Sequence, residues 1–260
     1  METMTDAPRW AVVTGASSGI GAQLARLLAA DGYGIALVAR SKPELQKVAE
    51  DIHQRYQADT RVVVADLAKP EAARDVAKQV ANLPVAVLIN NAGVGGSGAF
   101  AERSYEQDDA MIQLNVAALT NLTKLLLPQL GESKNGRIMN LASTAAFLPG
   151  PYMAVYYATK AFVLSFSQAL AAELGSTGIT VTAVCPGPTR TNFEVAAGAD
   201  GSRLFAGKVM DVETVARSAY RAMQRGQTVA VIGWRNKLTI TALRFVPRSL
   251  SAYLASRANR

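Results

Sequence analysis

The residues that could carry out chemistry lie between Ser143 and Lys160. Tyr156 and Lys160 stand four positions apart, and residues at that spacing share one face of a helix. A lysine ammonium beside a phenol favours the phenolate, so we expect Lys160 to lower the pKa of Tyr156 from about 10 toward the working pH. A general acid or base is most effective when its pKa lies near that pH. An ordinary amphipathic helix could carry the same pair, so the pair by itself is a weak signal.

Ser143 adds a third polar group to this pair. It follows an apolar run at 137–141, which predicts a buried strand. Its hydroxyl is therefore expected at the carboxyl end of that strand, which is the ligand edge of an open α/β sheet. The helix that carries Tyr156 and Lys160 is predicted over 152–174.

A glycine-rich turn follows the first predicted strand, at 10–14. Glycines let the backbone approach a pyrophosphate, and the N-terminus of the following helix offers free N–H groups and a positive dipole end. The spacing is Gly-x-x-x-Gly-x-Gly, and a plain tight turn is the alternative. Because the turn opens a βαβ unit, we predict a nucleotide site formed by Gly15, Ser17, Ser18, Gly19, Ile20 and Gly21.

The second predicted strand, at 35–38, ends in Ala39 and Arg40. Folds that prefer NAD place a carboxylate after this strand to hold the ribose 2′-OH. Here the carboxylate is missing, and an arginine guanidinium can pair with a 2′-phosphate in a fork geometry. The pattern favours NADP, with Lys42 as a possible helper, although Arg40 could also be a solvated loop residue.

Further polar and small residues follow the next strands. Asp66 and Leu67 end a strand predicted at 61–65, and Asp66 could accept a hydrogen bond from an adenine amino group or cap a helix beginning near Pro70. The strand at 85–89 is followed by Asn90, Asn91, Ala92 and Gly93, a loop able to pass close to a ligand. Asn90 and Asn91 could instead tie adjacent strands together.

A long helix predicted over 104–130 contains Asn115 among apolar residues. An asparagine there needs hydrogen-bond partners, so it is either a satisfied core residue or part of a proton relay. Strands are also predicted at 180–184 and 228–232, and helices at 43–57 and 211–225. After the strand at 180–184, Pro186, Gly187 and Thr189 turn the chain over the ligand edge, and 189–209 is expected to be a lid or binding segment.

Taken together, these motifs resemble the short-chain dehydrogenase/reductase family over residues 10 to about 232. The resemblance rests on Thr14-Gly15-x-x-x-Gly19-x-Gly21, Asp66-Leu67, Asn90-Asn91-Ala92-Gly93, Asn115, Ser143, Tyr156-x-x-x-Lys160 and Pro186-Gly187. It implies a single doubly wound Rossmann domain of the α/β class, with about seven parallel strands and helices on both faces.

The resemblance also implies roles for the site residues. Tyr156 would donate the proton to a carbonyl oxygen, Ser143 would hydrogen-bond that oxygen, and Asn115 would hold a water in a proton relay. Lys160 would bind the nicotinamide ribose and keep the pKa of Tyr156 low. Ala39-Arg40 matches the NADP-preferring pattern. The implied NADP(H) site includes Gly15, Ser17, Ser18, Gly19, Ile20, Gly21, Arg40, Asp66, Leu67, Asn91, Ala92, Gly93, Tyr156, Lys160, Pro186, Gly187 and Thr189.

Charge is distributed unevenly along the 260 residues. The net charge is +7, and nine basic residues but no acidic ones follow Glu213. The segment 233–260 is predicted to be a helical extension to a catalytic domain at 1–232. One face would carry Lys237 and Arg244, and another would carry Leu238 and Phe245, before Pro247 interrupts. Packing on the protein itself, on a second subunit or on a membrane surface are all open.

Composition and leader features suggest a location. No apolar run approaches the roughly 20 residues of a membrane-spanning helix, the start lacks signal-peptide character, and Cys185 is the single cysteine. We therefore expect a cytoplasmic protein. His53 is the single histidine and lies in a polar helix, and the spacing of the chain predicts no metal site.

The function predicted from these features is NADPH-dependent reduction of a carbonyl to an alcohol, or the reverse. A small-molecule substrate is expected, and the family resemblance implies a homo-oligomer, either a dimer or a tetramer. Alternatives are a 3-oxoacyl reductase acting on a carrier- or CoA-bound chain, whose acidic carrier the basic tail could hold, and a non-catalytic NADP-binding regulator. The basic tail alone does not indicate nucleic-acid binding, because no recognition motif accompanies it.

Overall fold

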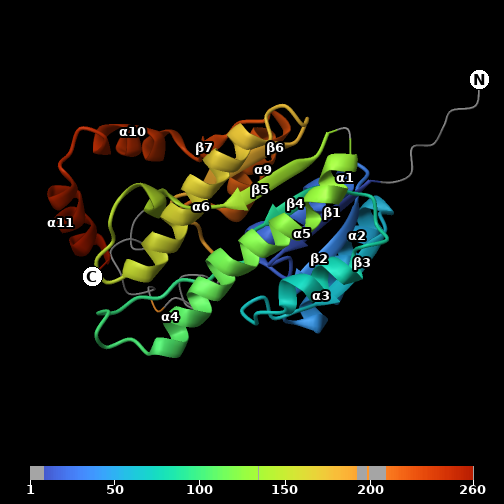
Figure 1. Ribbon diagram of the computed structural model, residues 1–260, viewed down its shortest axis with the longest axis horizontal. Helices are drawn as coiled ribbons and strands as arrows, with labels where there is room; N and C mark the ends of the chain where they lie inside the picture. The colour runs from blue at the N-terminus through green and yellow to red at the C-terminus, as the bar shows by residue number, and fades with distance from the viewer. Residues whose placement is uncertain (1–8, 134, 192–197, 199–208, 260) are drawn as a thin grey trace, which may run out of the picture.

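The computed structural model describes residues 9–133, 135–191, 198 and 209–259. Seven parallel strands form one sheet in the order β3-β2-β1-β4-β5-β6-β7 (Figure 1). Their bounds are β1 Trp10–Thr14, β2 Gly34–Ala39, β3 Thr60–Val64, β4 Val85–Asn90, β5 Arg137–Leu141, β6 Thr180–Cys185 and β7 Val229–Val231. The order reverses between β1 and β4, and open α/β sheets bind ligands at such a switch point.

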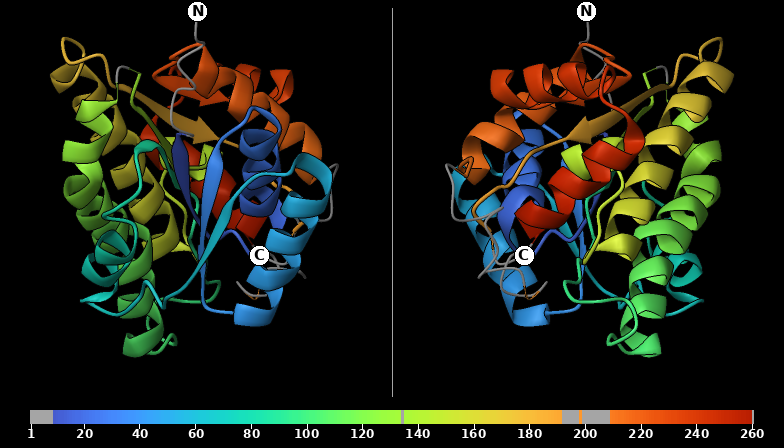
Figure 2. Two further views of the ribbon diagram at one scale, coloured as in Figure 1. Left: turned by 90° about the vertical axis from the view of Figure 1, so that its right-hand side faces the viewer. Right: turned by 90° about the vertical axis from the view of Figure 1, so that its left-hand side faces the viewer.

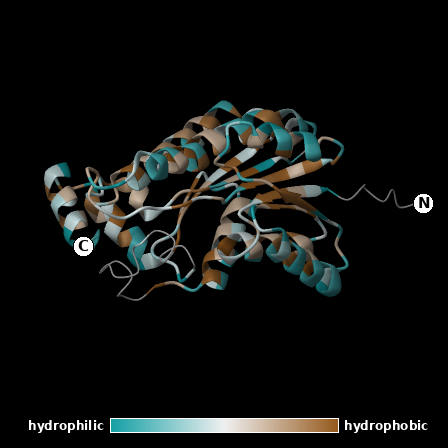
Figure 3. Cartoon of the chain, turned by 90° about the horizontal axis from the view of Figure 1, so that it is seen from below, coloured by the Kyte–Doolittle hydropathy of each residue, from teal (hydrophilic) through white to brown (hydrophobic). Residues whose placement is uncertain are grey.

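The inner strands are apolar on both sides because helices cover both faces of the sheet. In β2, Ile35 and Leu37 pack into one core cluster, whereas the alternating Ala36 and Val38 pack into the other. Figure 2 shows the two helix layers on either side of the sheet, and Figure 3 shows hydrophobic strands between helices whose outer faces are hydrophilic. The predicted fold class is thereby confirmed.

A different set of helices covers each face of the sheet. One core cluster joins the sheet to α1 (Gly19–Ala30), α2 (Lys42–Tyr56) and α9 (Val212–Gln224). The other contains residues of α3 (Ala72–Gln79), α5 (Leu119–Glu132) and α6 (Ala154–Glu173). The predicted strands and these helices differ from the observed ones mostly at their ends, where propensity is least decisive.

The helix predicted over 104–130 is one continuous helix with an irregular centre. It consists of α4 (Tyr105–Ile112), the π-helical segment η1 (Gln113–Ala118) and α5. A π-helical turn inserts an extra residue into an α-helix and often marks a functional site. The segment directly after Ser143 forms a short 3₁₀ helix, η2 (Thr144–Phe147). Most of the predicted lid at 189–209 lies outside the described residues.

The α4–α5 helix corrects one expectation about membrane spans. Tyr105–Glu132 is long and apolar enough to cross a membrane by length and composition. Its apolar residues Leu122, Leu126 and Leu130 are buried in the core cluster beside the sheet, and a core helix of a globular domain passes the same test.

The tail forms two helices, α10 (Trp234–Leu243) and α11 (Arg248–Asn259). We expected Leu238 and Phe245 to form an apolar face opposite the charges, but α10 buries only Ile240, and Phe245 is 86% exposed. In α11 the buried residues are the small or polar Ser251, Ala255 and Asn259. Apart from Ile240, the buried residues of the tail are small or polar, whereas Trp234, Leu238, Phe245, Tyr253 and Leu254 are exposed.

A chain of buried amides links the centre of the sheet to both helices that cover it. Asn90 donates to Thr123 Oγ1 and to Asn140 Oδ1, each at 2.9 Å. Asn140 donates in turn to Ser167 Oγ at 2.9 Å, and Ser167 donates to the carbonyl of Val163 at 2.6 Å. Each of the side chains of Asn90, Thr123, Asn140 and Ser167 thus has a partner, which is what makes these polar residues tolerable in the core.

Asn140→Ala should destabilise the protein because it removes two buried hydrogen bonds and leaves Asn90 and Ser167 short of partners. We expect a loss of about 2–3 kcal/mol in the free energy of unfolding, or roughly 4–12 °C in Tm. Asn121→Ala, at an exposed position of α5, is the matched control and should change stability by less than about 0.5 kcal/mol. Equal melting temperatures for the two variants would show that the amide chain adds nothing to stability.

Candidate active site

The glycine turn after β1 is closed by close packing. A Cβ on Gly15 would lie 2.6 Å from Asn91 Nδ2, and a Cβ on Gly21 would lie 2.3 Å from the carbonyl oxygen of Gly15. Gly15 also has φ +64°, a conformation that favours glycine. Ser18, the N-cap of α1, uses no side-chain cap, and the first turn of α1 carries no acidic residue. The N–H groups and positive dipole end of α1 are therefore available to an anion.

The loop after β4 is tied to this turn. Asn91 Nδ2 donates to the carbonyls of Thr14 (2.9 Å) and Gly15 (3.2 Å). Thr14 Oγ1 accepts from the backbone N–H groups of Asn91 and Ala92 and donates to the carbonyl of Ile89. The suggestion that Asn91 ties neighbouring strands is confirmed, whereas Asn90 bonds to side chains. Asp66 does not cap α3, whose N-cap is Glu71; its carboxylate accepts from the N–H of Ala68.

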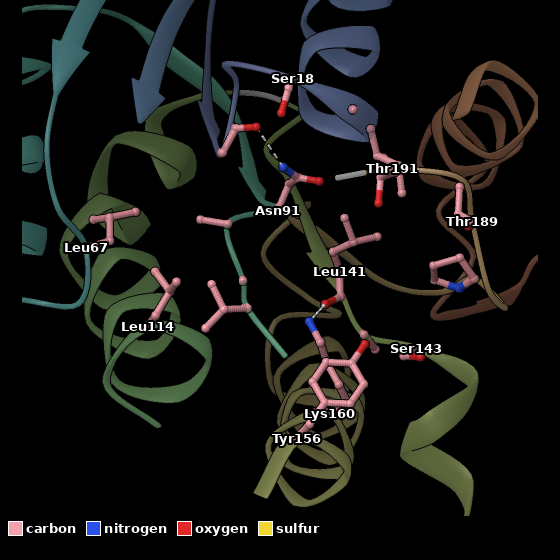
Figure 4. A pocket seen from close by; sticks show the side chains of 18 of the residues that line it. Ser18, Leu67, Asn91, Leu114, Leu141, Ser143, Tyr156, Lys160, Thr189 and Thr191 are labelled. Carbon is pink, nitrogen blue, oxygen red and sulfur yellow. Dashed lines mark hydrogen bonds between the residues drawn. The ribbon is translucent and has the colours of Figure 1, made fainter. Parts of the chain in front are cut away.

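Ser143, Tyr156 and Lys160 converge at the carboxyl end of β5 (Figure 4). Ser143 is the N-cap of η2; its Oγ accepts from the N–H of Ala145 at 3.1 Å and its side chain hydrogen-bonds Tyr156. Successive turns of α6 bring Tyr156 and Lys160 to the same face, with Lys160 Nζ 5.9 Å from the centroid of the Tyr156 ring. Lys160 Nζ donates to the carbonyl of Leu141 at 2.7 Å.

The electrostatics of the pair differ from the sequence-based expectation. Burial raises the pKa of Tyr156 to about 12, and the hydrogen bond from Ser143 opposes that rise only in part. Burial also lowers the pKa of Lys160 to about 8. The expectation that Lys160 holds the pKa of Tyr156 low is therefore wrong for this structure. The physical reason is that the Lys160 ammonium is directed at the carbonyl of Leu141, while loss of water disfavours both charged forms.

Asn115 is buried and fully bonded. Its Oδ1 accepts from the N–H of Val94 at 3.0 Å, and its Nδ2 donates to the carbonyl of Val94 at 2.9 Å and to Thr159 Oγ1 at 3.1 Å. Thr159 Oγ1 donates to the carbonyl of Tyr156. The side chain of Asn115 thus joins the loop after β4 to the turn of α6 that carries Tyr156, as a satisfied core asparagine does.

One cavity of about 430 Å³ connects these parts. Of the residues predicted to bind a cofactor, the structure places all but Gly21 on its wall, and Gly21 instead supports Gly15 from behind. Asn115 is also behind the wall. Among the wall residues that the sequence reasoning did not assign to the site are Val94, Met153 and Tyr157. Val94 and Met153 carry no motif, and Tyr157 is three residues from Lys160 rather than four.

The far end of the cavity is formed by Arg40, which is exposed and follows β2. Across the parts of the chain that the structure describes, Arg40 has no hydrogen bond or ion pair. Its guanidinium is therefore free for an anion. An open helix N-terminus, a glycine turn without room for side chains and a free arginine fit the phosphates of a dinucleotide.

Comparisons with known proteins agree with this geometry. A sequence model described as short chain dehydrogenase matches residues 9–201. Very-long-chain 3-oxoacyl-CoA reductases from Anas platyrhynchos and Homo sapiens are 39% and 36% identical over 186 and 183 residues, which cover 68% of this chain and 58% of theirs. The match thus spans little more than half the length of these relatives.

Solved structures extend the similarity to the tail. A short-chain dehydrogenase from Sphingobium yanoikuyae in complex with NADPH is 34% identical, with a TM-score of 0.83 and coverage of 93% of this chain and 94% of that one. A bulky-bulky ketone specific alcohol dehydrogenase from Comamonas testosteroni is 32% identical, with a TM-score of 0.78 and 93% coverage of both chains.

The glycine turn, the converging serine, tyrosine and lysine, and the match over 9–201 lead to one conclusion: this chain belongs to the short chain dehydrogenase family.

Proposed function

We propose that the protein is an NADPH-dependent oxidoreductase that reduces a carbonyl to an alcohol. The observation that carries the proposal is a single cavity that joins the phosphate-binding turn and Arg40 to Ser143, Tyr156 and Lys160. Bound NADPH would supply the hydride, which this set of side chains cannot. The structures from Sphingobium yanoikuyae and an L-sorbose reductase from Gluconobacter frateurii contain NADPH, which supports this choice of cofactor.

The side chains then have distinct tasks. Tyr156 donates a proton to the carbonyl oxygen, and a pKa of about 12 keeps it protonated near neutral pH, as reduction requires. Ser143 hydrogen-bonds the same oxygen, and Lys160 binds the nicotinamide ribose. Asn115 would hold a water of the proton relay. Its side chain is already hydrogen-bonded, so the contact with that water would come from the backbone of the π-helical turn at 113–118. Asp66, Leu67, Pro186, Gly187 and Thr189 complete the cofactor walls.

Tyr156→Phe should abolish most of the turnover while NADPH still binds. The variant keeps the ring and removes the acid, and general acid catalysis contributes about 10²–10⁴-fold. The measurement is kcat by NADPH absorbance together with the NADPH Kd. Tyr105→Phe, at a position that is 77% exposed, is the matched control and should keep wild-type kcat. Normal turnover in Tyr156→Phe would remove this residue from the mechanism.

Cofactor choice rests on Arg40 and on the absence of a carboxylate at position 39. A charge-assisted hydrogen bond contributes about 1.5–3 kcal/mol, and each 1.4 kcal/mol is about a tenfold change in affinity. One such bond from Arg40 to the 2′-phosphate therefore supports a roughly 10–100-fold preference for NADPH over NADH.

Arg40→Ala should weaken NADPH binding by that factor and leave NADH binding nearly unchanged. Ala39→Asp should reverse the preference, because its carboxylate repels the phosphate and accepts the 2′-OH. The Kd of both cofactors is measured in the three proteins, with Arg74→Ala, an exposed arginine on α3, as the matched control. A preference that survives in Arg40→Ala would show that Arg40 is only a solvated loop residue.

A second candidate function is reduction of a 3-oxoacyl thioester. The curated relatives carry that name, and the nine basic residues after Glu213 suit an acidic CoA or carrier. Comparing kcat/KM for simple ketones with that for 3-oxoacyl-CoA chains distinguishes the two. A non-catalytic regulator is disfavoured, since it has no need of Ser143, Tyr156, Lys160 and Asn115 together.

We also propose that 1–232 acts as the catalytic domain of a cytoplasmic homo-oligomer.

We propose further that the extension 233–260 contacts an anionic membrane surface. Trp234 (71%), Leu238 (65%) and Phe245 (86%) are exposed on or beside α10, and Tyr253 and Leu254 are exposed on α11. Arginines lie over two of the aromatic rings, and 233–260 has no acidic side chain. Exposed aromatic and aliphatic residues among cations fit a lipid interface better than a neutral protein surface.

The protein should therefore sediment with vesicles of phosphatidylglycerol and phosphatidylcholine and be released by salt, since salt screens exposed charges. A triple variant, Trp234→Ser, Leu238→Ser and Phe245→Ser, should lose binding, whereas Phe100→Ser and Tyr105→Ser, which remove equally exposed rings elsewhere, should not. Absence of binding would contradict the proposal. A second result would also contradict membrane contact by the extension 233–260. If sedimentation without vesicles shows an oligomer that only the triple variant dissociates, a second copy of the chain covers this surface.

A further inference from the structure

The last turn of α11 reaches back to the substrate end of the cavity. Figure 1 shows α10 beside β7 and α11 turning away from it, so that the last turn of α11 lies beside the start of α6. Asn259 is 4% exposed there. Its Nδ2 donates to the carbonyl of Pro151 at 2.9 Å, and its Oδ1 accepts from the hydroxyl of Tyr157 at 3.0 Å. The side chain of Asn259 thus binds Pro151 and Tyr157, each more than a hundred residues earlier in the sequence.

One partner of Asn259, Tyr157, borders the reacting groups, and the other, Pro151, lies two residues before Met153 on the cavity wall. Tyr157 is on the cavity wall and 8% exposed, and its ring packs edge-to-face on Tyr156 with centroids 6.1 Å apart. The ring also fills the space beside Gly150, where a Cβ would come within 2.3 Å of it. A shift of Tyr157 would therefore move both the wall and the segment 148–153.

The segment 148–153 contains an unfavourable backbone conformation that hydrogen bonds hold in place. Tyr152 has φ +66°, a conformation that is costly for a residue with a side chain and persists only where its surroundings impose it. From one side the N–H of Gly98 donates to the carbonyl of Tyr152 at 2.9 Å. From the other side Asn259 holds the carbonyl of Pro151. Met153, at the end of the segment, lines the cavity.

The α11 helix can come this close because its domain-facing side is made of small residues. Ala255 and Ser251 are buried one and two turns before Asn259, whereas Tyr253 and Leu254 face solvent. Along that face, Asn259 is the residue that hydrogen-bonds the catalytic domain. The helix thus delivers one polar group to one place at the cavity.

We infer that Asn259 is a positioning residue for the substrate: it fixes Tyr157 and the segment 148–153, and so sets the space beside Tyr156 for the larger substituent of the substrate. This inference rests on the proposed carbonyl reduction. Asn259 itself does not line the cavity, so it acts through Tyr157 and Pro151. Without the hydrogen bonds of Asn259, the segment 148–153 can relax, because the positive φ of Tyr152 is a costly conformation.

The test compares Asn259→Ala with Ser256→Ala, a partly exposed position on the same helix. For a series of ketones from small dialkyl to bulky aryl–alkyl compounds, Asn259→Ala should lower the ratio of kcat/KM for bulky over small substrates by about tenfold, mainly through KM. Its kcat for a small ketone and its NADPH Kd should stay within about twofold. Tyr157→Phe should reproduce part of the change, and the double variant should fall short of the sum.

A second measurement does not depend on ketone reduction. Hydrogen exchange of the amides in 150–157 should become about tenfold faster in Asn259→Ala, with exchange in β1 unchanged and Ser256→Ala like wild type. Unchanged exchange, or an unchanged substrate ratio in a protein that does reduce ketones, would overturn the inference. A uniform loss across all substrates together with weaker NADPH binding would also overturn it, because that is the result of general destabilisation. If the unmodified protein reduces no ketone, the proposed function fails, while the exchange result still decides whether Asn259 holds this segment.

Discussion

The site depends on the hydrogen bonds between Thr14 and Asn91, which join the glycine turn after β1 to the loop after β4. At the switch point, the segments that follow β1 and β4 turn toward opposite faces of the sheet. This leaves backbone groups at the ends of both strands without partners in the sheet. Thr14 Oγ1 and Asn91 Nδ2 satisfy these groups and press the glycine turn against the next strand. The free N–H groups of α1 then face the cavity, whose wall includes Ser18, Gly19 and Ile20.

A second set of buried polar bonds does for the reacting groups what Thr14 and Asn91 do for the phosphate end. Asn140 in β5 and Ser167 in α6 fix the strand and the helix that supply Ser143, Tyr156 and Lys160. Asn115 fixes the loop after β4 against the same helix. The protein thus places its ionisable groups with neutral amides, which cost less to bury than charges do. The low exposure that results explains why the pKa of Tyr156 is raised and the pKa of Lys160 is lowered.

Much of this could be predicted from sequence because the relevant signals are local. Apolar runs bounded by glycine, proline and asparagine predict the strands, and the four-residue spacing of Tyr156 and Lys160 needs nothing beyond a helix. The pKa of Tyr156 could not be predicted, because it depends on burial and on where the Lys160 ammonium points. Nor could the packing of α11, since apolar side chains normally turn inward and here Leu250 and Leu254 do not. The role of Tyr157 depends on Asn259, and no spacing rule connects residues so far apart.

The π-helical turn at 113–118 has a consequence for how α4 faces the site. Each residue of an α-helix turns the chain by about 100°, so the inserted residue rotates α4 by that amount relative to α5. With this rotation Met111 is 1% exposed and packs in a cluster with Tyr156 and Tyr157, while the adjacent Ile112 is 43% exposed. A chain shortened by one residue within the turn would keep every motif residue and still carry the wrong side of α4 toward both tyrosines. The length of this helix, counted in single residues, is therefore as much a part of the active site as the groups that line it.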